Sequence, residues 1–216
     1  MARTKLKKLR EVRELPCVFS VDENVEEKLR KYFGNDHSVS LEIGCGHGDY
    51  SFELGSTFPE RNFIGIDIKG NRIWTAAKKV LEVELKNVVF IISRAENLIS
   101  IFRNRKIEEI FIPFPDPHIK RKSESKRLIS PHFLKIYKNI LKTEGKIHFK
   151  TDNDFLFNYF INEVILQNNL NIIDLSNDLY SSDNLEEVKQ VKTFYEKSYL
   201  EEGRKIKYAS FNFNNK

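Results

Sequence analysis

Short hydrophobic runs alternate with longer stretches of helical period along most of the chain. Runs rich in β-branched and aromatic residues, which predict strands, occupy 39–43, 62–67, 87–92, 108–113 and 145–151. Between them, apolar positions recur at helical spacing, as in 73–81 and 133–140. The pattern predicts further helices at 22–33, 155–167 and 191–202 and further strands at 171–175 and 205–212.

This alternation predicts an α/β fold of the Rossmann-like type, in which seven strands form an open, mostly parallel sheet with helices on both faces. Ligands bind such sheets at the carboxyl ends of the strands. Residues 1–20 are expected to form a basic flexible arm, and residues 21–216 a single domain. No internal repeat or low-complexity stretch interrupts the pattern.

Composition indicates a cytoplasmic protein, and its charge suits a polyanionic partner; the alternative is that the clustered cations are only a solvated surface. With 216 residues, 40% of them hydrophobic, the chain can bury one core, and no apolar run approaches the roughly 20 residues of a membrane span. The net charge is +5, and Lys and Arg cluster in the first 14 residues and again at 120–127. Cys17 and Cys45 show no disulfide or metal spacing, which fits a reducing compartment.

Three glycines follow the first predicted strand, in the segment LEIGCGHGD. Gly44, Gly46 and Gly48 permit positive φ and close approach of the backbone to a ligand. The third glycine comes one residue earlier than in a dinucleotide fingerprint, and Glu42 precedes the first, which favours a nucleoside cofactor without a pyrophosphate. Asp67 ends the second strand, where a carboxylate accepts hydrogen bonds from ribose hydroxyls. The alternative is a turn that only permits close packing, with Asp67 capping a helix.

Asp116 stands between two prolines directly after the fourth predicted strand. That strand is adjacent to the first in a doubly wound order, so Asp116 is expected to face the glycine loop. Pro115 and Pro117 restrict the turn, and Phe114 and His118 are placed to pack against a flat base. The alternative is a turn that only ends a strand. Five cations follow that are expected to contact phosphates: Lys120, Arg121, Lys122, Lys126 and Arg127.

Five motifs in order carry a resemblance over nearly the whole chain: LEIGCGHGDY, GIDI, FPDPxxKR followed by KRL, HFKTDN and TFYE. On these residues the chain resembles the bacterial tRNA (guanine-N7)-methyltransferase family. The resemblance implies a class I methyltransferase that uses S-adenosylmethionine and modifies guanine 46 in the variable loop of tRNA.

The resemblance also implies roles for individual residues. The cofactor acids are Glu42, Asp67 and Asp116, beside Gly44 and Gly46 of the glycine loop, and Asp116 is also the catalytic residue. The contacts with tRNA or its guanine are assigned to Lys120, Asp152, Thr193, Phe194, Tyr195 and Glu196. From the residues alone, Asp152 also reads as a helix N-cap and TFYE as the first turn of a helix.

Three positions depart from the family pattern. Arg94 stands where the family usually has Asp or Asn, and it cannot accept a hydrogen bond from the adenine amino group. Either Arg94 contacts the adenine only through its backbone, or Glu96 accepts the hydrogen bond from the adenine amino group instead. His118 replaces a common tryptophan and Ser123 a histidine, so contacts with the base are expected to differ.

The proposed chemistry suits these residues, because guanine N7 carries a lone pair and no proton, so no general base is needed. Asp116 is therefore expected to orient guanine and offset the positive charge that reaches the purine. We expect tRNA as partner, no metal, no membrane, and a monomer or homodimer. Two alternatives remain: a methyltransferase of a small metabolite, which would not need the clustered cations, and a catalytically idle RNA-binding module, which would not need Glu42 and Asp67 together.

Overall fold

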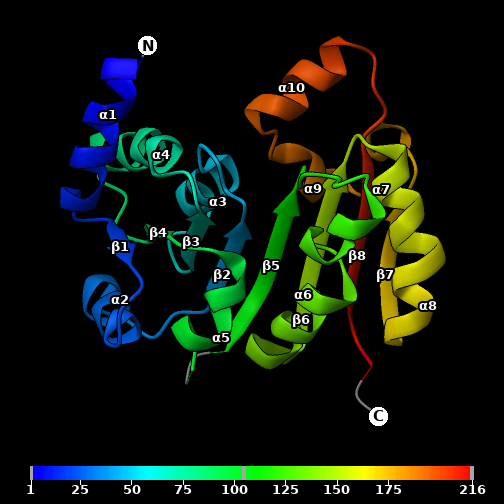
Figure 1. The fold of residues 1–216 in the computed structure, drawn as a ribbon, viewed down its shortest axis with the longest axis horizontal. Coiled ribbons are helices and arrows are strands. Elements are labelled where there is room, and N and C mark those ends of the chain that lie inside the picture. The colour runs from blue at the N-terminus through cyan, green and yellow to red at the C-terminus, as the bar shows by residue number, and fades with distance from the viewer. Residues whose placement is uncertain (1, 104–105, 215–216) are drawn as a thin grey trace.

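The computed structural model, which describes residues 2–103 and 106–214, is built around one eight-stranded sheet (Figure 1). Its strands are β1 (Val18–Ser20), β2 (Val39–Ile43), β3 (Asn62–Asp67), β4 (Val88–Ile92), β5 (Ile107–Pro113), β6 (Leu141–Thr151), β7 (Leu170–Ser176) and β8 (Lys207–Phe213). Their order is β1-β4-β3-β2-β5-β6-β8-β7, and among these described strands β8 alone runs opposite to the others. The predicted α/β class is confirmed; the predicted seven strands miss the short β1.

The connections place helices on both faces of the sheet. Those from β2 to β3 and from β3 to β4 run toward one edge, whereas those from β5 to β6 and from β6 to β7 run toward the other. Right-handed crossovers therefore put α3 (Asp49–Thr57) and α4 (Gly70–Glu82) on one face, and α6 (Pro131–Ile140), α7 (Asp154–Tyr159) and α8 (Ile165–Asn168) on the opposite face. The remaining helices are α1 (Ala2–Glu11), α2 (Val25–Phe33), α5 (Leu98–Ile101), α9 (Glu186–Gln190) and α10 (Phe194–Glu201).

The apolar faces predicted at 73–81 and 133–140 are buried in α4 and α6. Ile73 and Val80 of α4 and Phe133 and Tyr137 of α6 pack in the main core. The helix expected at 155–167 is divided, since a π-helical stretch at Phe160–Val164 separates α7 from α8. No described helix is both long enough and apolar enough to cross a membrane.

Residues 2–20, expected as a flexible arm, are part of the fold. Helix α1 contacts α4, where Lys8 lies 4.5 Å from the ring centre of Trp74 and the Trp74 indole donates to Glu11 at 3.0 Å. Strand β1 then pairs with β4 at the edge of the sheet. The physical reason is the tryptophan, whose half-buried ring offers α1 a surface to pack on. Residue 1 of the expected arm and residues 215 and 216 of the expected domain lie outside the described residues.

Candidate active site

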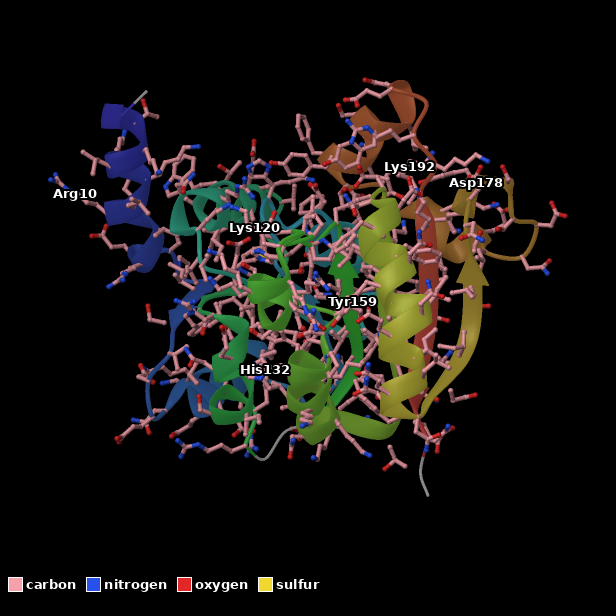
Figure 2. All side chains as sticks on the ribbon, turned by 45° about the vertical axis from the view of Figure 1, so that its right-hand side comes forward. Arg10, Lys120, His132, Tyr159, Asp178 and Lys192 are labelled. Carbon is pink, nitrogen blue, oxygen red and sulfur yellow. The ribbon has the colours of Figure 1, made fainter. Side chains whose placement is uncertain are left out.

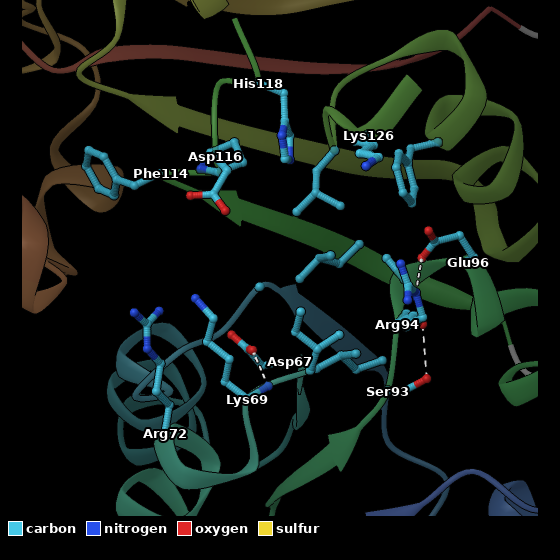
Figure 3. Close-up of a pocket in the computed structure, with 18 of the residues that line it drawn as sticks. Asp67, Lys69, Arg72, Ser93, Arg94, Glu96, Phe114, Asp116, His118 and Lys126 are labelled. Atoms are coloured by element: carbon cyan, nitrogen blue, oxygen red, sulfur yellow. Dashed lines mark hydrogen bonds and ion pairs between the residues drawn. The ribbon is translucent and has the colours of Figure 1, made fainter. Parts of the chain in front are cut away.

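A cleft of about 490 Å³ opens at the carboxyl ends of β2, β3 and β5, where the direction of the strand connections reverses. Figure 3 shows Asp116 on one wall, with Asp67, Lys69 and Arg72 on the wall opposite. A volume of this size is typical of small-molecule sites. The cleft therefore lies where the sequence predicted a ligand.

The glycine turn and Asp67 form one hydrogen-bonded unit in this cleft. Gly44 and Gly46 adopt φ of 71° and 54°, the left-handed region that favours glycine. The Gly46 amide donates to Oδ2 of Asp67 at 2.9 Å, and the Lys69 amide donates to Oδ1 at 2.7 Å. Each carboxylate oxygen keeps a further lone pair, so Asp67 can still accept from a ligand hydroxyl.

The turn that carries Asp116 is held in an unusual conformation. Phe114 and His118 have φ of 50° and 41°, which is uncommon for residues other than glycine. The Phe114 amide donates to the Lys150 carbonyl at 2.9 Å, which ties the start of the turn to β6. Asp116 itself is solvent-accessible and lines the cleft. The structure thus brings Asp116, Gly44 and Asp67 to one cavity.

Glu42 lies behind the glycine turn and not on the wall of the cleft. Its side chain is 3% exposed, and Oε2 accepts from the amide and hydroxyl of Ser51 at 2.9 and 2.7 Å. Burial raises the pKa of Glu42 to about 8, because a charge is costly in an apolar environment. In this arrangement Glu42 braces the start of α3 beneath the turn.

Aromatic rings and cations complete the cleft. Tyr195 and Tyr199 of α10 line it, and the Arg72 guanidinium lies 6.0 Å from the ring centre of Tyr195. Lys69 and Lys126 also line it. Sequence reasoning missed Lys69, Arg72 and Tyr199, because no motif or spacing marks them and only the fold brings α4 and α10 together.

The TFYE segment has a divided role. Thr193 caps α10 in a capping box with Glu196, and Glu196 has no exposed surface. Its carboxylate lies 3.0 Å from the Lys150 ammonium and accepts from the Tyr180 hydroxyl at 2.9 Å. The substrate contact expected of Glu196 is not available to a side chain buried in this way. Thr193, 5% exposed, is likewise engaged in the cap.

The exposed part of TFYE is its aromatic pair. Phe194 is 64% exposed, and its amide donates to Oδ2 of Asp49 at 2.8 Å, which docks α10 on the helix that follows the glycine turn. Tyr195 faces the cleft. These two side chains remain accessible to a substrate.

Asp152 lies away from the cleft. Its carboxylate accepts from Arg204 at 2.8 Å, and its carbonyl accepts from Lys207 at 3.0 Å, in a separate polar hollow. Asn153, not Asp152, caps α7, by accepting from the Leu156 amide at 2.9 Å. Asp152 is thus paired with Arg204 and does not line the cleft, and its expected contact with guanine stays a prediction.

The remaining predicted residues lie at the rim. Arg94 and Glu96 both line the cleft, with Nε of Arg94 3.8 Å from Oε2 of Glu96. Lys120 is exposed at the start of the 3-10 helix η3 (Arg121–Lys126). Arg127, expected to contact phosphates, is instead 4% exposed. Among the described residues, no three His, Cys, Asp or Glu side chains gather as a metal site would require.

Comparison with known proteins decides the family. Residues 36–209 match the family model described as "Putative methyltransferase". A tRNA (guanine-N(7)-)-methyltransferase of Bacteroides thetaiotaomicron is 39% identical over 98% of this chain and 86% of its own. Another, from Cytophaga hutchinsonii, is 40% identical over 99% of both chains. The chain belongs to the tRNA (guanine-N(7)-)-methyltransferase family.

Membership of this family agrees with the fold and with the resemblance seen in the sequence. The solved structure titled "Structure of an Antibiotic Related Methyltransferase" superposes with a TM-score of 0.63 at 24% identity, covering 86% of this chain and 92% of its own. That likeness confirms the class I methyltransferase fold. The protein is therefore a methyltransferase whose candidate active site is the cleft between the glycine turn and the Asp116 turn.

Proposed function

We propose that this protein transfers a methyl group from S-adenosylmethionine to N7 of guanine 46 in the variable loop of tRNA. The observation that carries the proposal is that Asp67 and Asp116 face one cleft from opposite walls, and that Gly44 of the glycine turn lines the same cleft. A nucleoside cofactor and a flat base need this combination of a ribose acceptor, a close backbone and a second carboxylate. The cysteines Cys17 and Cys45 are free thiols, which supports action in the cytoplasm.

The residues of the cleft fit the cofactor. At Gly44, a Cβ would point into the cleft and meet only the Leu128 side chain, at 3.6 Å, so glycine leaves room for a ligand against the backbone. Asp67 retains lone pairs for ribose hydroxyls, and Arg94 and Glu96, the two residues that the family resemblance suggests for the adenine, line the same cleft. When bound, S-adenosylmethionine supplies an electrophilic methyl group on a sulfonium.

Asp116 and the aromatic walls would orient the guanine. Phe114, Tyr195 and Tyr199 offer flat surfaces for a purine, and stacking on such rings tolerates an unpaired loop base. The N7 lone pair reacts without losing a proton, so Asp116 acts as an acceptor that fixes the base and offsets the charge gained by the ring. Its position on a turn with two left-handed residues keeps that carboxylate aimed at the cleft.

Cations at the rim would hold the RNA backbone. Lys120, Arg121 and Lys122 are exposed at the start of η3, and Lys69 and Arg72, at the start of α4, line the cleft. Phosphates bound on both sides of the cleft would present the loop base between them. This arrangement favours RNA over a small metabolite as the substrate.

The test is incorporation of labelled methyl into bulk tRNA, followed by digestion and separation of nucleosides. We expect the label in 7-methylguanosine. Asp116→Asn should lower kcat about 10²- to 10³-fold while tRNA is still retained on a filter. Asp178→Asn, at a carboxylate that precedes the short 3-10 helix Leu179–Ser181 and does not line the cleft (labelled in Figure 2), is the matched control and should turn over like the wild type. Label in another nucleoside, or undiminished turnover by Asp116→Asn, would contradict the proposal.

A further inference from the structure

Arg127 ends the cationic segment, yet its side chain turns inward. It is 4% exposed, whereas the neighbouring cations from Lys120 to Lys122 lie at the surface. Its guanidinium lies 4.1 Å from the ring centre of Tyr159 and 4.9 Å from that of Phe155, both on α7. Figure 2 marks Lys120 near the middle of the view and Tyr159 below it. A phosphate cannot reach a guanidinium enclosed in this way.

The donors of Arg127 are directed at the turn that carries Asp116. Nε donates to the Pro117 carbonyl at 3.2 Å and to the His118 carbonyl at 3.4 Å, and Nη2 donates to the His118 carbonyl at 3.3 Å. These two carbonyls belong to the residues immediately after Asp116. Arg127 is therefore bonded to the backbone next to the candidate catalytic carboxylate.

The turn is anchored at both ends, and Asp116 lies between the anchors. At its start the Phe114 amide is bonded to the Lys150 carbonyl at 2.9 Å. At its end His118 has φ of 41°, a conformation that a residue with a Cβ keeps only when its surroundings enforce it. Arg127 supplies that enforcement, because its planar fork reaches two successive carbonyls while its flat face stacks on a ring.

Helix α7 holds the segment that carries Arg127 by a second contact. The Tyr159 hydroxyl donates to Oε1 of Glu124 at 3.0 Å, so the same tyrosine that stacks on Arg127 also fixes η3. Burial and the hydrogen bond to the Glu124 carboxylate raise the pKa of the Tyr159 hydroxyl to about 12. This hydroxyl therefore keeps its proton and remains a donor at physiological pH. Arg127 thus has a rigid support.

We propose that Arg127 is a positioning residue for the methyl transfer: it holds the Asp116 turn by its carbonyls and does not contact RNA. This inference rests on the proposed function, in which Asp116 orients the guanine. A displacement of about 1 Å at a reacting group costs on the order of 10²-fold in rate, so loosening the turn should act on kcat.

Arg127→Lys separates the two possible roles, because it keeps the charge and loses the fork. A positioning role predicts that kcat falls about 10- to 100-fold, while the KM for tRNA and the salt dependence of tRNA binding stay within twofold of the wild type. A phosphate contact predicts nearly unchanged kcat. Lys120→Met is the comparison variant and should lower the slope of log K against log salt by about 0.7 to 0.9.

Hydrogen exchange of the peptide spanning 112–130, which includes the hydrogen-bonded amides of Phe114 and Ser123, gives a readout that does not depend on activity. Arg127→Lys and Arg127→Met should both speed exchange in this peptide, and Lys120→Met should not. If the wild type makes no 7-methylguanosine but exchange responds as stated, the proposed function is wrong, whereas the inference that Arg127 holds the Asp116 turn is supported. Unchanged exchange with unchanged kcat in Arg127→Lys would overturn the inference, as would a lowered salt slope in Arg127→Met.

Discussion

Replacing Lys150 by methionine removes one partner of a buried ion pair beside the candidate active site. The side chains of Lys150 and Glu196 are 2% and 0% exposed, and Nζ lies 3.0 and 3.3 Å from the two carboxylate oxygens. The same ammonium donates to the carbonyls of Val188 and Val191 at 2.9 and 3.1 Å. The pair therefore ties β6 to the segment that leads into α10.

The expected loss of folding stability comes from the buried Glu196 carboxylate that remains without its partner. In Lys150→Met the Glu196 carboxylate keeps its bonds from Tyr180 and the Thr193 amide but loses its counter-charge, which costs about 3 to 5 kcal/mol for a buried pair. In a chain of 216 residues this corresponds to a fall in Tm of roughly 6 to 20 °C. Glu196→Gln keeps an acceptor oxygen near Lys150 and should cost less, about 1.5 to 3 kcal/mol.

The assay is a double-mutant cycle by urea unfolding at pH 7. The double variant Lys150→Met/Glu196→Gln should be more stable than the sum of the single effects implies, by about 0.5 to 3 kcal/mol. Additive effects, or a Lys150→Met protein within 1 kcal/mol of the wild type, would refute the reasoning. At 20 °C, folded Glu196→Gln should keep the wild-type KM for tRNA within about twofold; a large rise would return Glu196 to the substrate.

Two further predictions concern charge and the aromatic wall. Because burial raises the folded-state pKa of Glu42 from 4.5 to about 8, the folded protein holds a proton that the unfolded chain releases, so stability falls as pH rises through this window, by about 3 kcal/mol at pH 7. Glu42→Gln should remove this part of the pH dependence, measured by urea unfolding at pH 5 and pH 8. If the stability of the wild type and of Glu42→Gln changed equally between these pH values, Glu42 would be ionised in the folded protein. Tyr195→Ala should raise the KM for tRNA about 5- to 100-fold through lost stacking, with Tyr195→Phe as the control that keeps the ring. Equal KM values for the two variants would exclude Tyr195 from the base site.

Local signals predicted the elements that position the cleft. The alternating runs gave β2, β3 and β5, and doubly wound order placed the end of β5 beside the glycine turn, as the pairing of β2 with β5 shows. Asp67 and Asp116 were predicted in this way, since Asp67 is the last residue of β3 and Asp116 lies three residues beyond the end of β5. Strand β1 was missed because its three residues show no alternation to detect.

The burial of individual charged side chains, and their partners from distant segments, could not be predicted from the sequence. Arg127 and Lys120 look alike in a cationic segment, and only the fold shows that Arg127 turns inward, where it lies against the rings of Phe155 and Tyr159 on α7. The sequence pattern predicts Glu196 as a substrate residue, whereas in the structure Lys150 of the distant strand β6 pairs with it in the interior. Such pairings depend on how strands and helices meet, which a single sequence does not specify.

Position-specific transfer to tRNA tests the central claim most directly. Two transcripts of one tRNA, with guanine or adenine at position 46, are incubated with the protein and labelled S-adenosylmethionine, and the nucleosides are separated. The account predicts 7-methylguanosine from the guanine 46 transcript and background label from the other. Equal 7-methylguanosine from both transcripts, or none from either, would contradict it.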